Sequence, residues 1–195
     1  THVPVHAVAN EWIEDVALPW DLHSAVVSYL RTDPEMVHKL DTNSPSFPSP
    51  RSWTKVAMIL NDGIPKEKDF IEQCLIEGDI GVDAQKIFYG HLQIFRSLRD
   101  PEVIIKNPDK AAIPEGPDMM AQLYAELTAL ARYAKNENVD QICRYFNRLP
   151  QEFAFCGYKD LLQRNKALLM AAPEAQKWLV KNHSIIVATG RKKND

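Results

Sequence analysis

Arg51 is the residue of this sequence best placed to bind a charged ligand, because a strong helix-start signal precedes it. Ser49 is a good N-cap residue, and Pro50 suits the first position of a helix. Trp53 follows, and apolar residues then recur at helical spacing at Val56, Ala57 and Leu60. The pattern predicts a helix from Pro50 with Arg51 in its first turn.

The position of Arg51 is unusual, because arginine is favoured at the opposite end of a helix, where it complements the dipole. At a helix N-terminus, free N–H groups and a guanidinium together form a site suited to a phosphate or a carboxylate. The alternative is a solvated arginine that only tolerates the dipole, and on spacing alone this is the commoner case. The residues by themselves leave both interpretations open.

The surrounding sequence resembles a known family. The segment Phe47-Pro-Ser-Pro-Arg-Ser-Trp53 follows Asn10-Glu-Trp-Ile-Glu-Asp-Val-Ala17 by some thirty-five residues. This order resembles the lid region of MoxR-type AAA+ ATPases, in which a Pro-Arg-Ser-Trp-like helix start follows a helix that contains tryptophan. The likeness covers residues 1–62. A looser likeness to the helical extensions of such ATPases, especially those of phage or prophage type, covers the rest.

The resemblance implies a domain organisation. Residues 1–62 would be a lid-like helical domain, residues 63–190 a C-terminal helical extension, and residues 191–195 a disordered tail. Arg51 would be the sensor-2 arginine, which contacts the γ-phosphate of ATP, bound with magnesium on an adjoining core. We therefore expect the chain to be a non-catalytic C-terminal fragment of an ATP hydrolase.

The resemblance also implies partners. They are the missing AAA+ core domain, the neighbouring subunits of a ring and a protein client that the machine remodels.

No catalytic or metal-binding motif is found in the chain itself. It has no Gly-x-x-x-x-Gly-Lys-Ser/Thr loop, no Gly-x-Ser-x-Gly elbow, no His-Glu-x-x-His pair and no Cys-x-x-Cys pair. His91 lies on an apolar helix face without a second ligand at metal spacing, which predicts a hydrogen-bonded histidine in the core or at its boundary rather than a metal ligand. The fragment alone is not expected to hydrolyse ATP.

Net charge, the length of apolar runs and the cysteine count each bear on the class of protein. The formal net charge of −3 gives no support to nucleic acid or an anionic membrane as the main partner. No apolar run approaches the roughly 20 residues that span a bilayer. The three cysteines are widely spaced and odd in number, which predicts buried free thiols in a reducing cytoplasm.

Helical spacing of apolar residues extends along the whole chain. It predicts an all-α fold in which a helical-bundle lid is followed by a second bundle, with one short strand at Thr1–Val8. Asp21 is expected to cap the second helix, and Gly157 to break a helix that starts near Pro150. Met120 is expected to fill the core. One stripe expected to be buried consists of Phe70, Ile71, Cys74 and Leu75.

Two other classes of protein stay open at this stage. A stand-alone helical adaptor for protein interactions would leave Arg51 as a surface residue. A small DNA-binding protein would use the Trp53 helix for recognition, although the net charge disfavours it.

Overall fold

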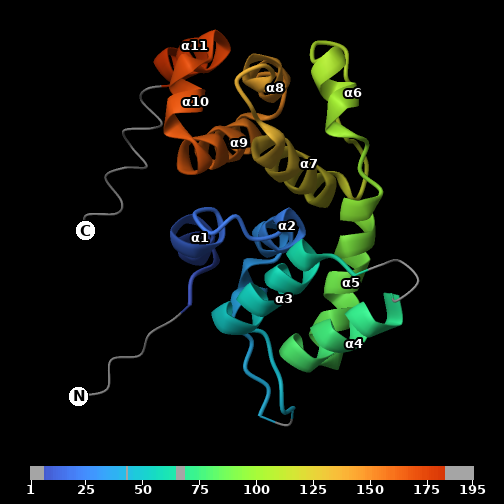
Figure 1. Cartoon of the computed structure of the whole chain (residues 1–195). Coiled ribbons are helices and arrows are strands. Elements are labelled where there is room, and N and C mark those ends of the chain that lie inside the picture. The colour runs from blue at the N-terminus through green and yellow to red at the C-terminus, as the bar shows by residue number, and fades with distance from the viewer. Residues whose placement is uncertain (1–6, 43, 65–68, 183–195) are drawn as a thin grey trace, which may run out of the picture.

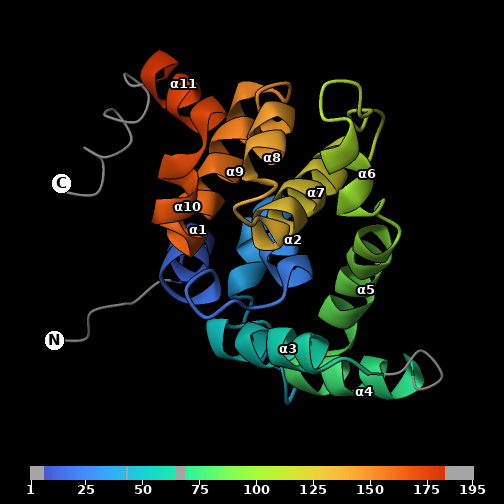
Figure 2. The ribbon, with the colours of Figure 1, turned by 45° about the horizontal axis from the view of Figure 1, so that its top comes forward.

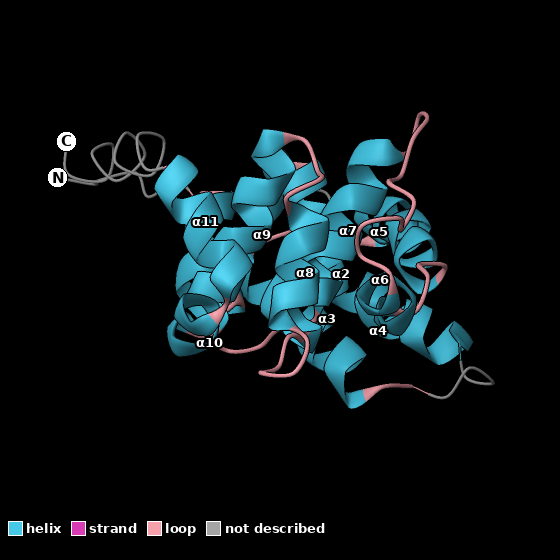
Figure 3. Ribbon diagram, turned by 90° about the horizontal axis from the view of Figure 1, so that it is seen from above, coloured by secondary structure: helices cyan, strands magenta, loops and turns pink. Residues whose placement is uncertain are grey.

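The computed structural model describes residues 7–42, 44–64 and 69–182. Every regular element in these ranges is a helix, so the predicted all-α fold is confirmed (Figure 3). The predicted strand falls largely on residues 1–6, which lie outside the described residues, and Ala7 and Val8 are not part of a strand. The predicted disordered tail, residues 191–195, also lies outside them.

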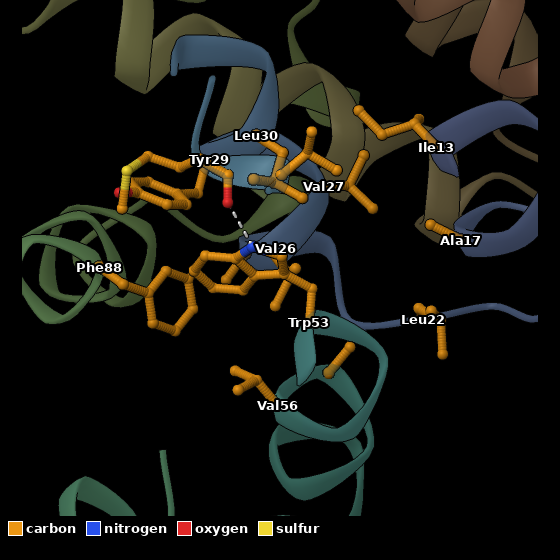
Figure 4. Close-up of a cluster of buried hydrophobic side chains, with 14 of the residues drawn as sticks. Ile13, Ala17, Leu22, Val26, Val27, Tyr29, Leu30, Trp53, Val56 and Phe88 are labelled. Carbon is orange, nitrogen blue, oxygen red and sulfur yellow. Dashed lines mark hydrogen bonds between the residues drawn. The ribbon is translucent and has the colours of Figure 1, made fainter. Parts of the chain in front are cut away.

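The first half of the molecule is a bundle around one hydrophobic cluster. Its elements are α1 (Ala9–Trp12), a π-helical turn (Ile13–Ala17), α2 (Ser24–Thr32), a 3-10 turn (Pro34–Val37), α3 (Pro50–Asp62), α4 (Asp69–Ile80) and α5 (Val82–Arg96). Tyr29, Trp53 and Phe88 meet at its centre, with ring centroids 5.3 to 5.4 Å apart (Figure 4). Inclined rings at this spacing attract one another beyond the effect of burial, so these residues join α2, α3 and α5.

The second half surrounds a separate hydrophobic cluster. Its elements are α6 (Pro101–Lys106), α7 (Met119–Tyr133), α8 (Val139–Phe146), α9 (Gln151–Arg164), α10 (Lys166–Ala171) and α11 (Pro173–Lys181). The Tyr158 ring stacks on Trp178 with centroids 4.3 Å apart, which holds α11 against α9.

Helix α7 connects the two halves. It packs against α2 and α5 of the first half and against α6, α8 and α9 of the second. Figures 1 and 2 accordingly show α7 over α2, with α6 to α11 forming one layer and α1 to α5 the other.

Ion pairs cross between these layers. The Arg31 guanidinium donates to both carboxylate oxygens of Asp160 and, at 2.9 Å, to Thr128 Oγ1. Lys159 pairs with Glu14 at the same boundary. The two clusters therefore meet through charged as well as apolar contacts.

The division between the clusters does not coincide with the predicted boundary at residue 62. The first cluster continues through Ile76 and Ile80 of α4 to Phe88 and Leu92 of α5. Helices α4 and α5 belong to the first bundle because their buried apolar residues are part of its cluster, where the Phe88 ring contacts Trp53 and Tyr29.

Helix α9 runs unbroken through Gly157, so the predicted break is wrong. A Cβ atom at this position would lie 2.6 Å from the Phe146 ring. The glycine allows α8 and α9 to approach closely, and the packing gained there outweighs its low helix propensity.

Two other predictions about single side chains are also wrong. Met120 is 50% exposed, because α7 turns the neighbouring Met119 toward the second cluster instead. Asp21 does not cap α2; the ring nitrogen Nδ1 of His23 accepts the Ala25 N–H at 3.2 Å. Asp21 adopts a positive φ of 49° and binds Arg132 and Arg164 of the second half.

Helix α4 contradicts the predicted buried stripe. It buries Glu72, Ile76 and Ile80, whereas the predicted stripe is exposed. The inner face can include Glu72 because its carboxylate accepts from the Arg96 guanidinium at 2.7 and 2.8 Å, which compensates for burying its charge.

Candidate functional site

The start of α3 is built as the sequence predicts. Ser49 is extended at φ −154° and ψ 160°, and its Oγ accepts the Ser52 N–H at 3.2 Å. In return, the Ser52 Oγ accepts the Ser49 N–H at 2.8 Å, and Pro50 occupies the first helical position. This reciprocal capping fixes the first turn of the helix.

Trp53 anchors that turn in the core. Its side chain is fully buried, and its indole Nε1 donates to the Met36 carbonyl oxygen at 2.6 Å (Figure 4). The indole thereby joins α3 to the 3-10 turn as well as to Tyr29 and Phe88. Trp53 fixes the inner side of the first turn of α3 against the core. Residues on the outer side of that turn therefore project from a fixed backbone.

Arg51 is such an outer residue. It is exposed, and it forms no ion pair or hydrogen bond with its side chain among the described residues. Lys55, one turn further along α3, instead donates to Asp79 Oδ1 at 3.0 Å. Arg51 is therefore the cation of this helix start that is available to an external anion.

The backbone adds to this capacity. Pro50 has no N–H, and the Ser52 N–H is used by the cap, so within the described residues the Arg51 N–H remains without an acceptor. The guanidinium and the backbone N–H of Arg51 could together donate to two oxygens of one phosphate or carboxylate group.

A separate groove of about 480 Å³ lies near α3. It runs between loop residues 39–42 and 44–48 and the start of α5, and its walls include Met36, Phe47 and Ile87. Arg51 is not among its lining residues. The structure therefore does not join the predicted anion site to this groove.

His91 lies in the core, which is one of the two positions predicted for it. The residue is 6% exposed, and Nε2 lies 2.8 Å from Ser28 Oγ. Burial lowers the pKa of His91 from 6.5 to about 4, so the ring is neutral at pH 7. Across the described ranges, no cluster of three or more His, Cys, Asp or Glu side chains is arranged to hold a metal ion.

The cysteines follow the prediction only in part. All three are free thiols, but Cys74 is exposed, Cys156 is half-buried, and only Cys143 is fully buried. Burial raises the pKa of the Cys143 thiol to about 12, which makes it unreactive.

A cluster of charges that the sequence did not reveal joins the two halves. Asp21 pairs with Arg164 and, at 3.0 Å, with Arg132, and these residues border a pocket of about 310 Å³. Each arginine lies in the last turn of its helix, which is a common position, so no sequence signal distinguishes this pair.

No protein-family model, curated protein or solved structure matches this chain. In the part of the chain that the structure describes, no helix combines the length and apolar character needed to cross a membrane.

Proposed function

We propose that this chain is the lid and C-terminal helical extension of a MoxR-like AAA+ ATPase, with Arg51 as its sensor-2 arginine. The observation that carries the proposal is an exposed Arg51, without an ion-pair partner among the described residues, on a capped helix start that Trp53 anchors in the core. This arrangement presents a guanidinium outward on a rigid support. A residue that contacts a phosphate on another domain needs such an exposed and fixed position.

The proposed mechanism uses the lid as a rigid body. Arg51 contacts the γ-phosphate of ATP, held with magnesium on the core domain, and stabilises its charge. Loss of the γ-phosphate removes that contact, and the lid rotates relative to the core. The contacts of Trp53 with Tyr29 and Phe88 transmit the rotation of α3 to α2 and α5.

The second bundle serves this function by contacting other proteins. The ion pair between Arg31 and Asp160 makes it move with the lid. In the proposed cytoplasmic machine, it fixes neighbouring subunits of the ring or recruits the client. ATP hydrolysis itself belongs to the core domain.

The test is Arg51→Ala in the intact parent ATPase. We expect ATP turnover to fall at least tenfold, because a transition-state charge contact is lost. Arg51→Lys should recover only part of the activity, since an ammonium cannot donate in the same forked geometry. Lys55→Ala is the matched control on the same helix and should leave turnover nearly unchanged. Turnover by Arg51→Ala equal to that of the control would reject the sensor-2 role.

A stand-alone helical adaptor is the second candidate, and the exposed apolar side chains of α4 favour it. The two candidates differ in what the coding region upstream of Thr1 contains. A Gly-x-x-x-x-Gly-Lys-Ser/Thr loop followed by an acidic strand supports the ATPase lid. An unrelated upstream domain supports the adaptor.

A further inference from the structure

The outward face of α4 is apolar and uncovered. It consists of Phe70, Ile71, Cys74, Leu75 and Gly78, here called the α4 outer face. Phe70 is 76% exposed, and Ile71 and Leu75 are each 46% exposed. At helical spacing these five residues share one side of the helix, opposite the buried Ile76 and Ile80.

Nothing in the described chain covers this face. Helix α4 packs against α3 and α5 and lies at the outer edge of the molecule in two views (Figures 1 and 2). A Cβ atom added at Gly78 would meet no atom within 4 Å. Contiguous exposed apolar side chains of this kind mark interaction sites on globular proteins.

The shape of the face suits a helix. Cys74 and Gly78 are small and lie one turn apart, with Phe70 one turn before them in the same row. Ile71 and Leu75 lie in the neighbouring row. Small side chains beside larger ones allow the ridge of a second helix to approach closely.

The charges around the face identify the partner. Residues 58–83 contain seven carboxylates and two lysines. Within the described residues, Arg96 binds Glu72 and Lys55 binds Asp79, whereas three exposed carboxylates form no ion pair. These three are Asp62, Glu77 and Asp83, at the ends of α3, α4 and α5.

We propose that the α4 outer face binds an amphipathic helix of a partner protein, whose apolar stripe is bordered by lysine or arginine. The apolar residues supply affinity, and the acidic border selects a basic helix and accelerates its association. A symmetric contact between two copies is disfavoured, because it would bring the two acidic borders together. The inference does not depend on Arg51 or on the proposed ATPase function.

The test uses two synthetic helical peptides of equal length that share a leucine stripe and differ in their polar positions. One carries lysine and the other glutamate, and binding is followed by fluorescence anisotropy. We expect the lysine peptide to bind at least tenfold more tightly to the chain, and added salt to reduce that difference. Equal affinity for the two peptides would overturn the proposal.

Variants locate the binding. Phe70→Ser combined with Leu75→Ser should weaken binding of the lysine peptide at least tenfold. Val180→Ser is the matched control, since Val180 is 80% exposed on α11. Glu77→Lys with Asp83→Lys tests the border without altering packed residues and should also weaken binding. Unchanged affinity in the first variant, or equal losses in that variant and the control, would place the site elsewhere.

Sedimentation velocity tests whether a second copy of the chain, rather than a basic helix, covers the α4 outer face. The chain should stay monomeric at the concentrations used for binding. A dimer that Phe70→Ser with Leu75→Ser dissociates would show that a second copy covers the face, which would overturn the basic-helix proposal.

Discussion

Arg31 on α2 and Asp160 on α9 form a two-pronged ion pair that joins the two hydrophobic clusters of this protein. The side chain of Arg31 is 8% exposed and that of Asp160 is fully buried. Burial disfavours the charge on Arg31, but the adjacent Asp160 carboxylate more than offsets it and raises the pKa of the guanidinium. Arg31 therefore keeps its charge between the halves.

Removing one partner of this pair should be costly. In Asp160→Asn the buried Arg31 charge loses its counterion, and we expect the free energy of unfolding to fall by about 3 to 5 kcal/mol. Replacing both residues by apolar ones, Arg31→Met with Asp160→Leu, should cost less, because no unpaired charge remains. Urea denaturation followed by circular dichroism measures both.

An exposed ion pair provides the control. Asp109 and Arg144 have side chains that are 55% and 43% exposed. Asp109→Asn should cost at most about 1 kcal/mol. If Asp160→Asn proved no more destabilising than this control, the pair would not hold the halves together.

Trp53 should dominate the stability of the first cluster. Trp53→Phe removes buried ring volume and leaves the Met36 carbonyl without the indole donor. We expect a loss of about 2 to 4 kcal/mol in the free energy of unfolding. Trp20→Phe, at a tryptophan that is 64% exposed, should change it by less than about 0.5 kcal/mol. Equal losses in the two variants would contradict the anchoring role.

His91 should make the protein less stable in mild acid. Its pKa is about 4 in the folded protein and 6.5 without burial, so the unfolded chain binds more protons between these values. Stability therefore falls as the pH falls through this window, by about 2 kcal/mol from this residue between pH 7.5 and 5. Below about pH 4 the residue causes no further loss.

The measurement compares chemical denaturation at the two pH values. His91→Gln keeps a polar partner for Ser28 but cannot gain a proton, so its stability should depend less on pH by that amount. His38→Gln, at an exposed histidine, is the control and should follow the wild type. A His91→Gln protein with the full wild-type pH dependence would show that another group causes the acid sensitivity.

Local patterns in the sequence determined the helices and the start of α3. Ser49, Pro50 and Trp53 specify a capped and anchored turn through interactions within a few residues, so spacing was enough to predict it. The core position of His91 followed from the apolar face of its own helix in the same way.

Tertiary structure decided which face of each helix is buried and which distant charges meet. Helix α4 offers two apolar stripes, and only its packing against α3 and α5, with Arg96 beside Glu72, selects Ile76 and Ile80 for the core. The pairing of Arg31 with Asp160 joins residues 129 positions apart, and periodicity carries no information about such contacts. Local patterns fix local geometry because the interacting groups are neighbours in the chain. The partners of a helix face or a buried charge depend on how all the helices pack.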